Sequence, residues 1–157
     1  MSELPGPIRD LVAAHRRIAL DSNVLIYLID GKGGRAETAA AIVDAVALGD
    51  VEGVIASVGL VEALVGPARA WDPVPFEQTA MTIRDLGLEV QPLTADVAED
   101  AAWIRGTSGA SLPDAIHLAS ARAAGATALI TNDRRIRSRP NLDVVYLDDL
   151  ALDQPLP

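Results

Sequence analysis

The 157-residue sequence contains no cysteine. This absence excludes disulfide bonds and thiolate metal sites, and it is consistent with a reducing compartment. Aromatic side chains are also scarce, with two tryptophans, two tyrosines and one phenylalanine. Proteins that hold single-stranded nucleic acid by base stacking need more of these rings. A nucleic-acid partner would therefore be held through its phosphate backbone.

Long hydrophobic runs are absent as well. Charged residues such as Asp21 and Asp30, or glycines, interrupt the apolar segments well short of the roughly 20 residues that cross a bilayer. The first ten residues carry acids and prolines instead of a basic segment followed by an apolar one, so we expect no secretory signal. The sequence predicts a cytoplasmic protein without membrane contact, folded as a single domain over residues 1–157.

Basic residues are outnumbered, with 13 Lys and Arg against 22 Asp and Glu and a net charge of −9. Such a charge argues against a nucleic-acid partner unless bound cations or a local basic patch offset it. The chain has clustered acids that could bind cations, and it has arginines that could form a basic patch. Lys32 is the only lysine of the sequence, and four of the arginines fall within NDRRIRSR, residues 132–139.

Short apolar segments alternate with segments of helical spacing along the chain. Strands are expected at residues 17–21, 53–57, 88–93, 127–131 and 142–147. Helices are expected at residues 22–29, 35–49, 58–69, 73–87, 94–106 and 111–125. This alternation predicts an α/β fold, a three-layer α/β/α sandwich with a central, mostly parallel sheet. In such sheets ligands bind beyond the carboxyl ends of the strands.

Four acids map to that edge. Asp21 ends the first strand and Asp133 follows the strand that ends at Thr131, while Glu62 and Asp114 lie in early turns of helices. Carboxylates gathered there would repel one another unless a cation lay between them. Oxygen ligands of this kind suit Mg²⁺ or Mn²⁺.

Each acid also has an ordinary structural explanation. Asp114, in SLPD, fits a helix-capping pattern, and Asp133 could cap a helix formed by RRIR. Asp21 could begin an Asx turn, and Glu62 could be a solvated helix residue, although its neighbours are apolar. For His117, three residues after Asp114, we favour a packing role over metal binding.

Four motifs occur together in order: IALDSNVLIYLI, SVGLVEALV, SLPDAIHLASA and ALITND. In this combination the chain resembles the PIN-domain ribonucleases, most closely the VapC-type toxins of bacterial toxin–antitoxin pairs, over about residues 17–147. The resemblance implies a PIN-like fold in which Asp21, Glu62, Asp114 and Asp133 form an acidic catalytic and metal-binding quartet. It also implies supporting polar roles for Ser22, Asn23 and Thr131.

The activity implied by this resemblance is RNA hydrolysis by a Mg²⁺- or Mn²⁺-dependent endoribonuclease, with a cognate antitoxin as partner and homodimers as the common assembly. Arg134 and Arg135 could contact RNA phosphates, or they could belong to a solvated surface. Residues 31–35, GKGGR, lack the spacing of a phosphate-binding loop and suggest a connection between helices.

Two other classes of protein remain open. A phosphatase of the haloacid-dehalogenase type also has an aspartate after its first strand, but it needs a second aspartate where this chain has Asn23, and a catalytic lysine. A non-catalytic protein-binding module would use the acids only to cap helices and to attract a basic partner.

Overall fold

A parallel five-stranded sheet forms the centre of the molecule. The computed structural model describes residues 4–152. The sheet has the strand order β3-β2-β1-β4-β5, and each neighbouring pair is parallel. Its strands are β1 (Arg17–Leu20), β2 (Glu52–Ala56), β3 (Glu89–Gln91), β4 (Ala128–Thr131) and β5 (Asp143–Tyr146). The predicted sheet is confirmed.

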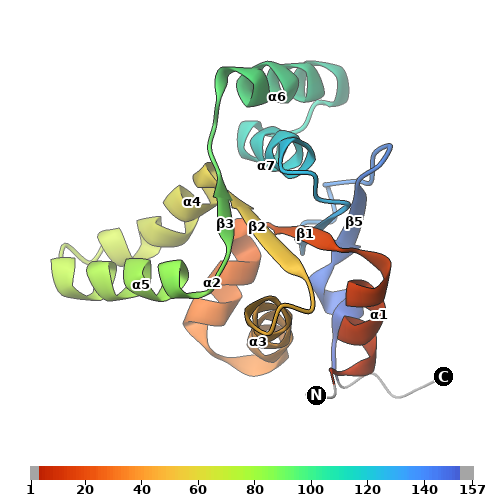
Figure 1. Cartoon of the computed structure of the whole chain (residues 1–157). Helices are drawn as coiled ribbons and strands as arrows, with labels where there is room; N and C mark the ends of the chain where they lie inside the picture. The colour runs from red at the N-terminus through yellow and green to blue at the C-terminus, as the bar shows by residue number, and fades with distance from the viewer. Residues whose placement is uncertain (1–3, 153–157) are drawn as a thin grey trace.

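Helices cover both faces of this sheet, which gives the expected three layers (Figure 1). They are α1 (Gly6–Ala14), α2 (Ser22–Asp30), α3 (Gly33–Ala47), α4 (Ser57–Ala68), α5 (Pro73–Asp85), α6 (Ala95–Ser108), α7 (Leu112–Ala123) and a short 3₁₀ helix, η1 (Leu147–Leu150). None of the helices within residues 4–152 has both the length and the hydropathy to span a bilayer.

Strand β1 shows how the core is divided between the two faces. Ile18 and Leu20 pack with α1, α2 and α3, whereas Ala19 between them packs with α6 and α7. This follows from the alternation of side chains along a strand. Because both faces are covered, β1 is apolar at consecutive positions, as a central parallel strand requires.

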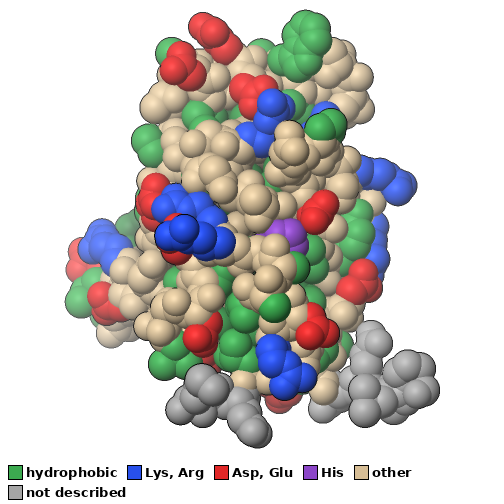
Figure 2. Space-filling model, turned by 45° about the vertical axis from the view of Figure 1, so that its right-hand side comes forward, with side chains coloured by type: hydrophobic (Ala, Val, Ile, Leu, Met, Phe, Trp, Pro, Cys, Tyr) green, Lys and Arg blue, Asp and Glu red, His purple; other side chains and the backbone are tan. Residues whose placement is uncertain are grey.

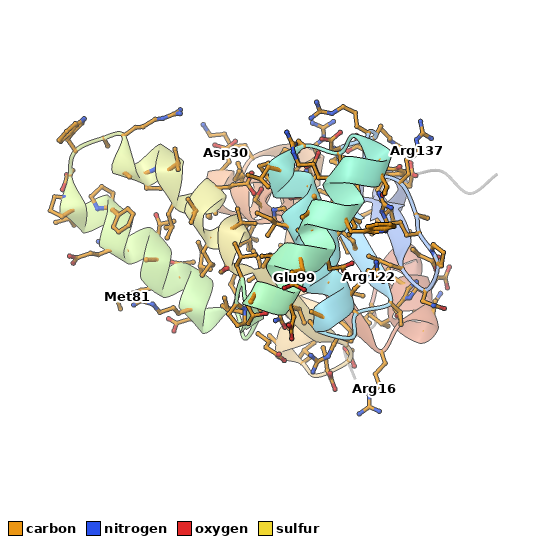
Figure 3. All side chains as sticks on the ribbon, turned by 90° about the horizontal axis from the view of Figure 1, so that it is seen from above. Arg16, Asp30, Met81, Glu99, Arg122 and Arg137 are labelled. Carbon is orange, nitrogen blue, oxygen red and sulfur yellow. The ribbon has the colours of Figure 1, made fainter. Side chains whose placement is uncertain are left out.

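Helices α4 and α5 form an arm that extends away from the sheet (Figures 1 and 3). Pro67 lies inside the last turn of α4, where it removes one helical hydrogen bond, and the helix ends at the next residue. At the base of the arm, Ala63 and Ile83 pack on Leu25 and Ile55. The arm therefore joins the sheet next to the carboxyl ends of β1 and β2.

Two segments differ from the predictions. Helix α1 was not expected, because its first turn contains prolines; proline is tolerated there because that turn needs no amide hydrogen, and Ile8 and Leu11 are buried. The arginine-rich segment after β4 is irregular, so Asp133 does not cap a helix. Its carboxylate instead accepts a hydrogen bond from the backbone amide of Arg135, 2.9 Å away, and so closes a turn.

Candidate metal and catalytic site

Asp21 lies at the centre of the site, between the end of β1 and the start of α2. It is the N-cap residue of α2, and its Oδ1 accepts the backbone amide of Ser22 at 2.7 Å. Only 6% of the residue is exposed. Capping and a functional position are thus compatible in this residue, because its second oxygen remains available to other partners.

The second carboxylate oxygen of Asp21 is bound by two of the three expected supporting residues. Thr131, at the end of β4, donates its hydroxyl to Oδ2 at 2.6 Å, and Asn23 donates its side-chain amide at 3.2 Å. The same threonine oxygen accepts the backbone amide of Asp133 at 3.0 Å. The hydroxyl of Thr131 therefore connects Asp21 at the end of β1 to the loop that carries Asp133.

His117 joins Asp21 to Glu62. Its Nε2 lies 2.7 Å from Oε1 of Glu62 and 3.3 Å from Oδ1 of Asp21, and only 2% of the residue is exposed. The expectation of a buried packing residue gave the right burial but missed these partners. The available signal was its position one turn after Asp114, on a neighbouring part of the same helix face.

Electrostatics at this cluster favour an ion pair. Burial alone would lower the pKa of His117, but the hydrogen bond to Glu62 and the charges of Asp21, Glu62 and Asp114 together raise it above 6.5. The hydrogen bond from His117 in turn lowers the pKa of Glu62, against the opposing effect of its partial burial. The two shifts agree that the protonated imidazole and the carboxylate stabilise each other.

The cluster also fits a divalent cation. One ligand atom each of Asp21, Glu62 and His117 lies within 4.8 Å of the others. Among the described residues, Oδ1 of Asn23 is buried beside Asp21 without a hydrogen-bond partner. The two carboxylates and the neighbouring amide oxygen form a hard donor set, which suits Mg²⁺ or Mn²⁺, while the protonated imidazole of His117 holds Glu62 beside Asp21.

Asp114 and Asp133 lie at the same edge but outside that three-residue cluster. Asp114 is in the first turn of α7, where its backbone amide is capped by the hydroxyl of Ser111 at 3.2 Å. Hydrogen bonds from Arg135 lower the pKa of Asp133, and the shortest of them, from Nη2 to Oδ2, is 2.7 Å. Of the four predicted acids, the structure thus brings Asp21 and Glu62 together through their contacts with His117.

The two arginines expected to contact RNA have different surroundings. Arg134 makes two hydrogen bonds to Asp149, at 2.7 and 3.2 Å, and its guanidinium lies 4.1 Å from the ring centre of Tyr146. Arg135 pairs with Asp133 and lines a cavity next to Asp114. On the face shown in Figure 2, basic and acidic side chains are scattered among other residues, and no broad basic surface is present.

A second cavity, of about 330 Å³, lies next to Glu62. Its walls are largely apolar and come from α2 and α4, including Ile26, Ile29 and Pro67. Lys32, from the segment GKGGR, lies at its border. Two separate cavities therefore adjoin the acidic residues, an arginine-lined one at Asp114 and an apolar one at Glu62.

These features define an all-parallel α/β/α domain with an acidic site beyond the carboxyl ends of β1 and β4. The sequence matches the PIN domain family over residues 18–142, and the chain belongs to that family. The resemblance drawn from its motifs is thereby confirmed. A search of curated proteins found no sequence match.

Solved structures share this fold. A chain of a toxin–antitoxin complex from Klebsiella pneumoniae superposes with a TM-score of 0.63 at 24% identity, covering 80% of this chain and 94% of that one. VapBC2 from Rickettsia felis, bound to a DNA fragment from its promoter, gives 0.63 at 18% identity, covering 83% and 98%. VapC20 from Mycobacterium tuberculosis, a Sarcin-Ricin loop cleaving toxin, gives 0.55 at 20% identity, covering 71% and 86%.

Proposed function

We propose that this protein is a metal-dependent endoribonuclease and the toxin of a toxin–antitoxin pair. The observation that carries the proposal is the convergence of Asp21, Glu62 and His117, three residues distant in sequence, with one ligand atom of each within 4.8 Å of the others. Family membership and the toxins among the structural neighbours support the same activity.

The side chains divide the work as follows. Asp21 and Glu62 provide oxygens for Mg²⁺ or Mn²⁺, and Asp114 and Asp133 complete the negative edge around them. When bound, the cation lowers the pKa of a water molecule and offsets negative charge on the phosphate. Thr131, Asn23 and Ser22 fix the orientation of the Asp21 carboxylate, and His117 holds Glu62 against it.

A haloacid-dehalogenase phosphatase is disfavoured by the positions of Asn23 and Lys32. Asn23 stands where the second aspartate is needed, and it donates a hydrogen bond to Asp21 instead of accepting a proton. Lys32 borders the apolar cavity on the outer side of Glu62. The remaining rival is a binding module without catalysis, which the following experiment distinguishes.

The test compares two aspartates in equivalent helix positions. Asp114 and Asp96 each lie in the first turn of a helix, α7 and α6. With purified protein, RNA and Mg²⁺, we expect EDTA to abolish cleavage and Asp114→Asn to reduce kcat by at least about 100-fold, because a charge at the reacting centre is lost. Asp96→Asn should cleave at the parent rate.

If the folded, partner-free protein cuts no RNA, or if Asp114→Asn is as active as Asp96→Asn, the acids serve capping and binding only. Sequencing the ends of the products would identify the cleavage site in the RNA.

The apolar cavity beside Glu62 supports the proposed antitoxin partner. Ile26 and Ile29 of α2 line it and are 43% and 37% exposed, and α4 also carries the exposed Val61 and Val65, at 62% and 39%. An apolar segment carrying a basic side chain would cover these residues and reach the carboxylate of Glu62. We expect the protein alone to be a homodimer. Light scattering after chromatography should show a larger complex when the antitoxin is co-expressed. An unchanged mass would reject the partner.

A further inference from the structure

A cavity of about 460 Å³ lies beside Asp114 and shares no lining residue with the apolar cavity. The end of α6 and the start of α7 form one wall, with Ser108, Gly109, Ala110 and Ser111. The irregular segment after β4 forms the other wall, with Arg135, Arg137 and Arg139. In Figure 3, Arg137 lies on the same side of the molecule as Asp30, whereas Arg16, which precedes β1, lies on the opposite side.

The charges in this cavity are incompletely balanced. Arg135 is paired with Asp133. Within residues 4–152, no acidic group forms an ion pair with Arg137 or Arg139, although neighbouring Arg134 and Arg135 both have carboxylate partners. In addition, Nε of Arg139 is buried without a hydrogen-bond partner among these residues. A buried donor left unbonded is destabilising, so an acceptor that reaches it would be stabilising.

The shape and lining of the cavity favour a backbone phosphate as that acceptor. A guanidinium group matches the geometry of phosphate oxygens and remains charged at all physiological pH values. No aromatic side chain lines the cavity, so it offers no surface on which a base could stack. Small residues along the α6–α7 wall leave room for the ribose-phosphate chain.

From this we infer that the cavity binds the phosphate of the nucleotide next to the scissile one, through Arg137 and Arg139. The inference rests on the proposed RNA cleavage, and it gives the bound strand a direction: from the acidic cluster past Asp114 toward the segment after β4. Because the contacts are to phosphate, they should contribute equally to all RNA sequences.

The experiment measures binding of a fluorescent RNA oligonucleotide by anisotropy, in a Glu62→Gln parent that lacks one acid outside this cavity. Arg137→Gln and Arg139→Gln should each raise Kd about 10-fold, the loss expected for one charge-assisted contact. The slope of log Kd against log salt should fall by about 1 for each variant. Arg9→Gln, at an exposed position of α1, is the matched control and should leave both values unchanged.

Two different failures are distinguishable. If the native protein cleaves RNA but both cavity variants bind within twofold of the parent with the same salt slope, the cavity assignment is wrong and the nuclease proposal stands. If the native protein neither cleaves nor binds RNA, both are wrong. If Arg139→Gln fails to fold, it loses binding altogether instead of showing a reduced salt slope. Arg137 is exposed, so Arg137→Gln tests the cavity independently.

Discussion

At the scale of single residues, His117 determines how the two nearest acids are held. Two carboxylates this close repel each other, and a buried imidazole between them offsets that repulsion. Its contacts at 2.7 and 3.3 Å hold Glu62 and Asp21 together. We therefore expect His117 to act on the site by positioning Glu62.

This arrangement predicts a pH dependence of stability in EDTA-treated protein. The pKa of His117 is raised in the fold, so its stabilisation is complete below about pH 6.5 and is lost as pH rises through the folded-state value. The pKa of Glu62 is lowered, so its contribution is present above about 4.5 and is lost as pH falls through its folded-state value. The free energy of unfolding should thus decline above pH 6.5 and below pH 4.5.

Urea denaturation across this pH range measures the effect. His117→Gln can still donate to Glu62 but does not titrate, so the decline above pH 6.5 should disappear. His117→Leu should be less stable than His117→Gln, because it leaves the carboxylate without a donor. Parallel pH profiles for the native protein and His117→Gln would show that the imidazole carries no charge in this site.

At the scale of elements, the packing of α4 on β2 and α7 sets the position of Glu62. Gly59 lies one turn before Glu62, and a Cβ atom there would meet Ile55 at 2.8 Å and Cε1 of His117 at 3.1 Å. The absence of a side chain at residue 59 lets α4 approach the sheet closely enough for Glu62 to reach His117. Gly66, on the same helix, has open space around it.

These two glycines give a matched pair of variants. Gly59→Ala should destabilise the protein by about 1–3 kcal/mol, because it overpacks the contact between α4 and the sheet. Gly66→Ala should be neutral or stabilising by up to about 1 kcal/mol, because alanine favours a helix more than glycine does. Thermal unfolding compares them, and equal melting temperatures would contradict the close packing described at Gly59.

Most of the helices and strands could be predicted from the sequence, whereas one helix and the contact between His117 and Glu62 could not. Apolar runs and helical spacing predicted the strands and the six helices from α2 to α7, since a buried parallel sheet requires continuous apolar strands. Helix α1 was missed because prolines normally mark the end of helices and its burial depends on α3. The contact between His117 and Glu62 joins residues 55 apart, so the spacing from Asp114 could place His117 near the acids but could not identify Glu62 as its partner.

At the scale of the whole molecule, a net charge of −9 is compatible with the proposed RNA substrate because of where the unpaired basic groups of the described residues lie. Several basic groups are neutralised by neighbouring acids, as in the pairs of Arg35 with Asp148 and Arg134 with Asp149. Arg137 and Arg139 remain beside the acidic edge without such partners in the described chain. A divalent cation in the cluster would add positive charge at the point where the phosphate must approach.

The central claim is that Asp21, Glu62 and their neighbours at the carboxyl edge bind a divalent cation. Electron paramagnetic resonance of free Mn²⁺ during a titration measures this directly, with Asp21→Asn and Asp96→Asn as the compared variants. The account predicts saturable Mn²⁺ binding, displaced by Mg²⁺, in the native protein and Asp96→Asn, and a loss of at least about 10-fold in affinity in Asp21→Asn. Equal Mn²⁺ affinity in all three proteins, or no saturable binding in any of them, would contradict it.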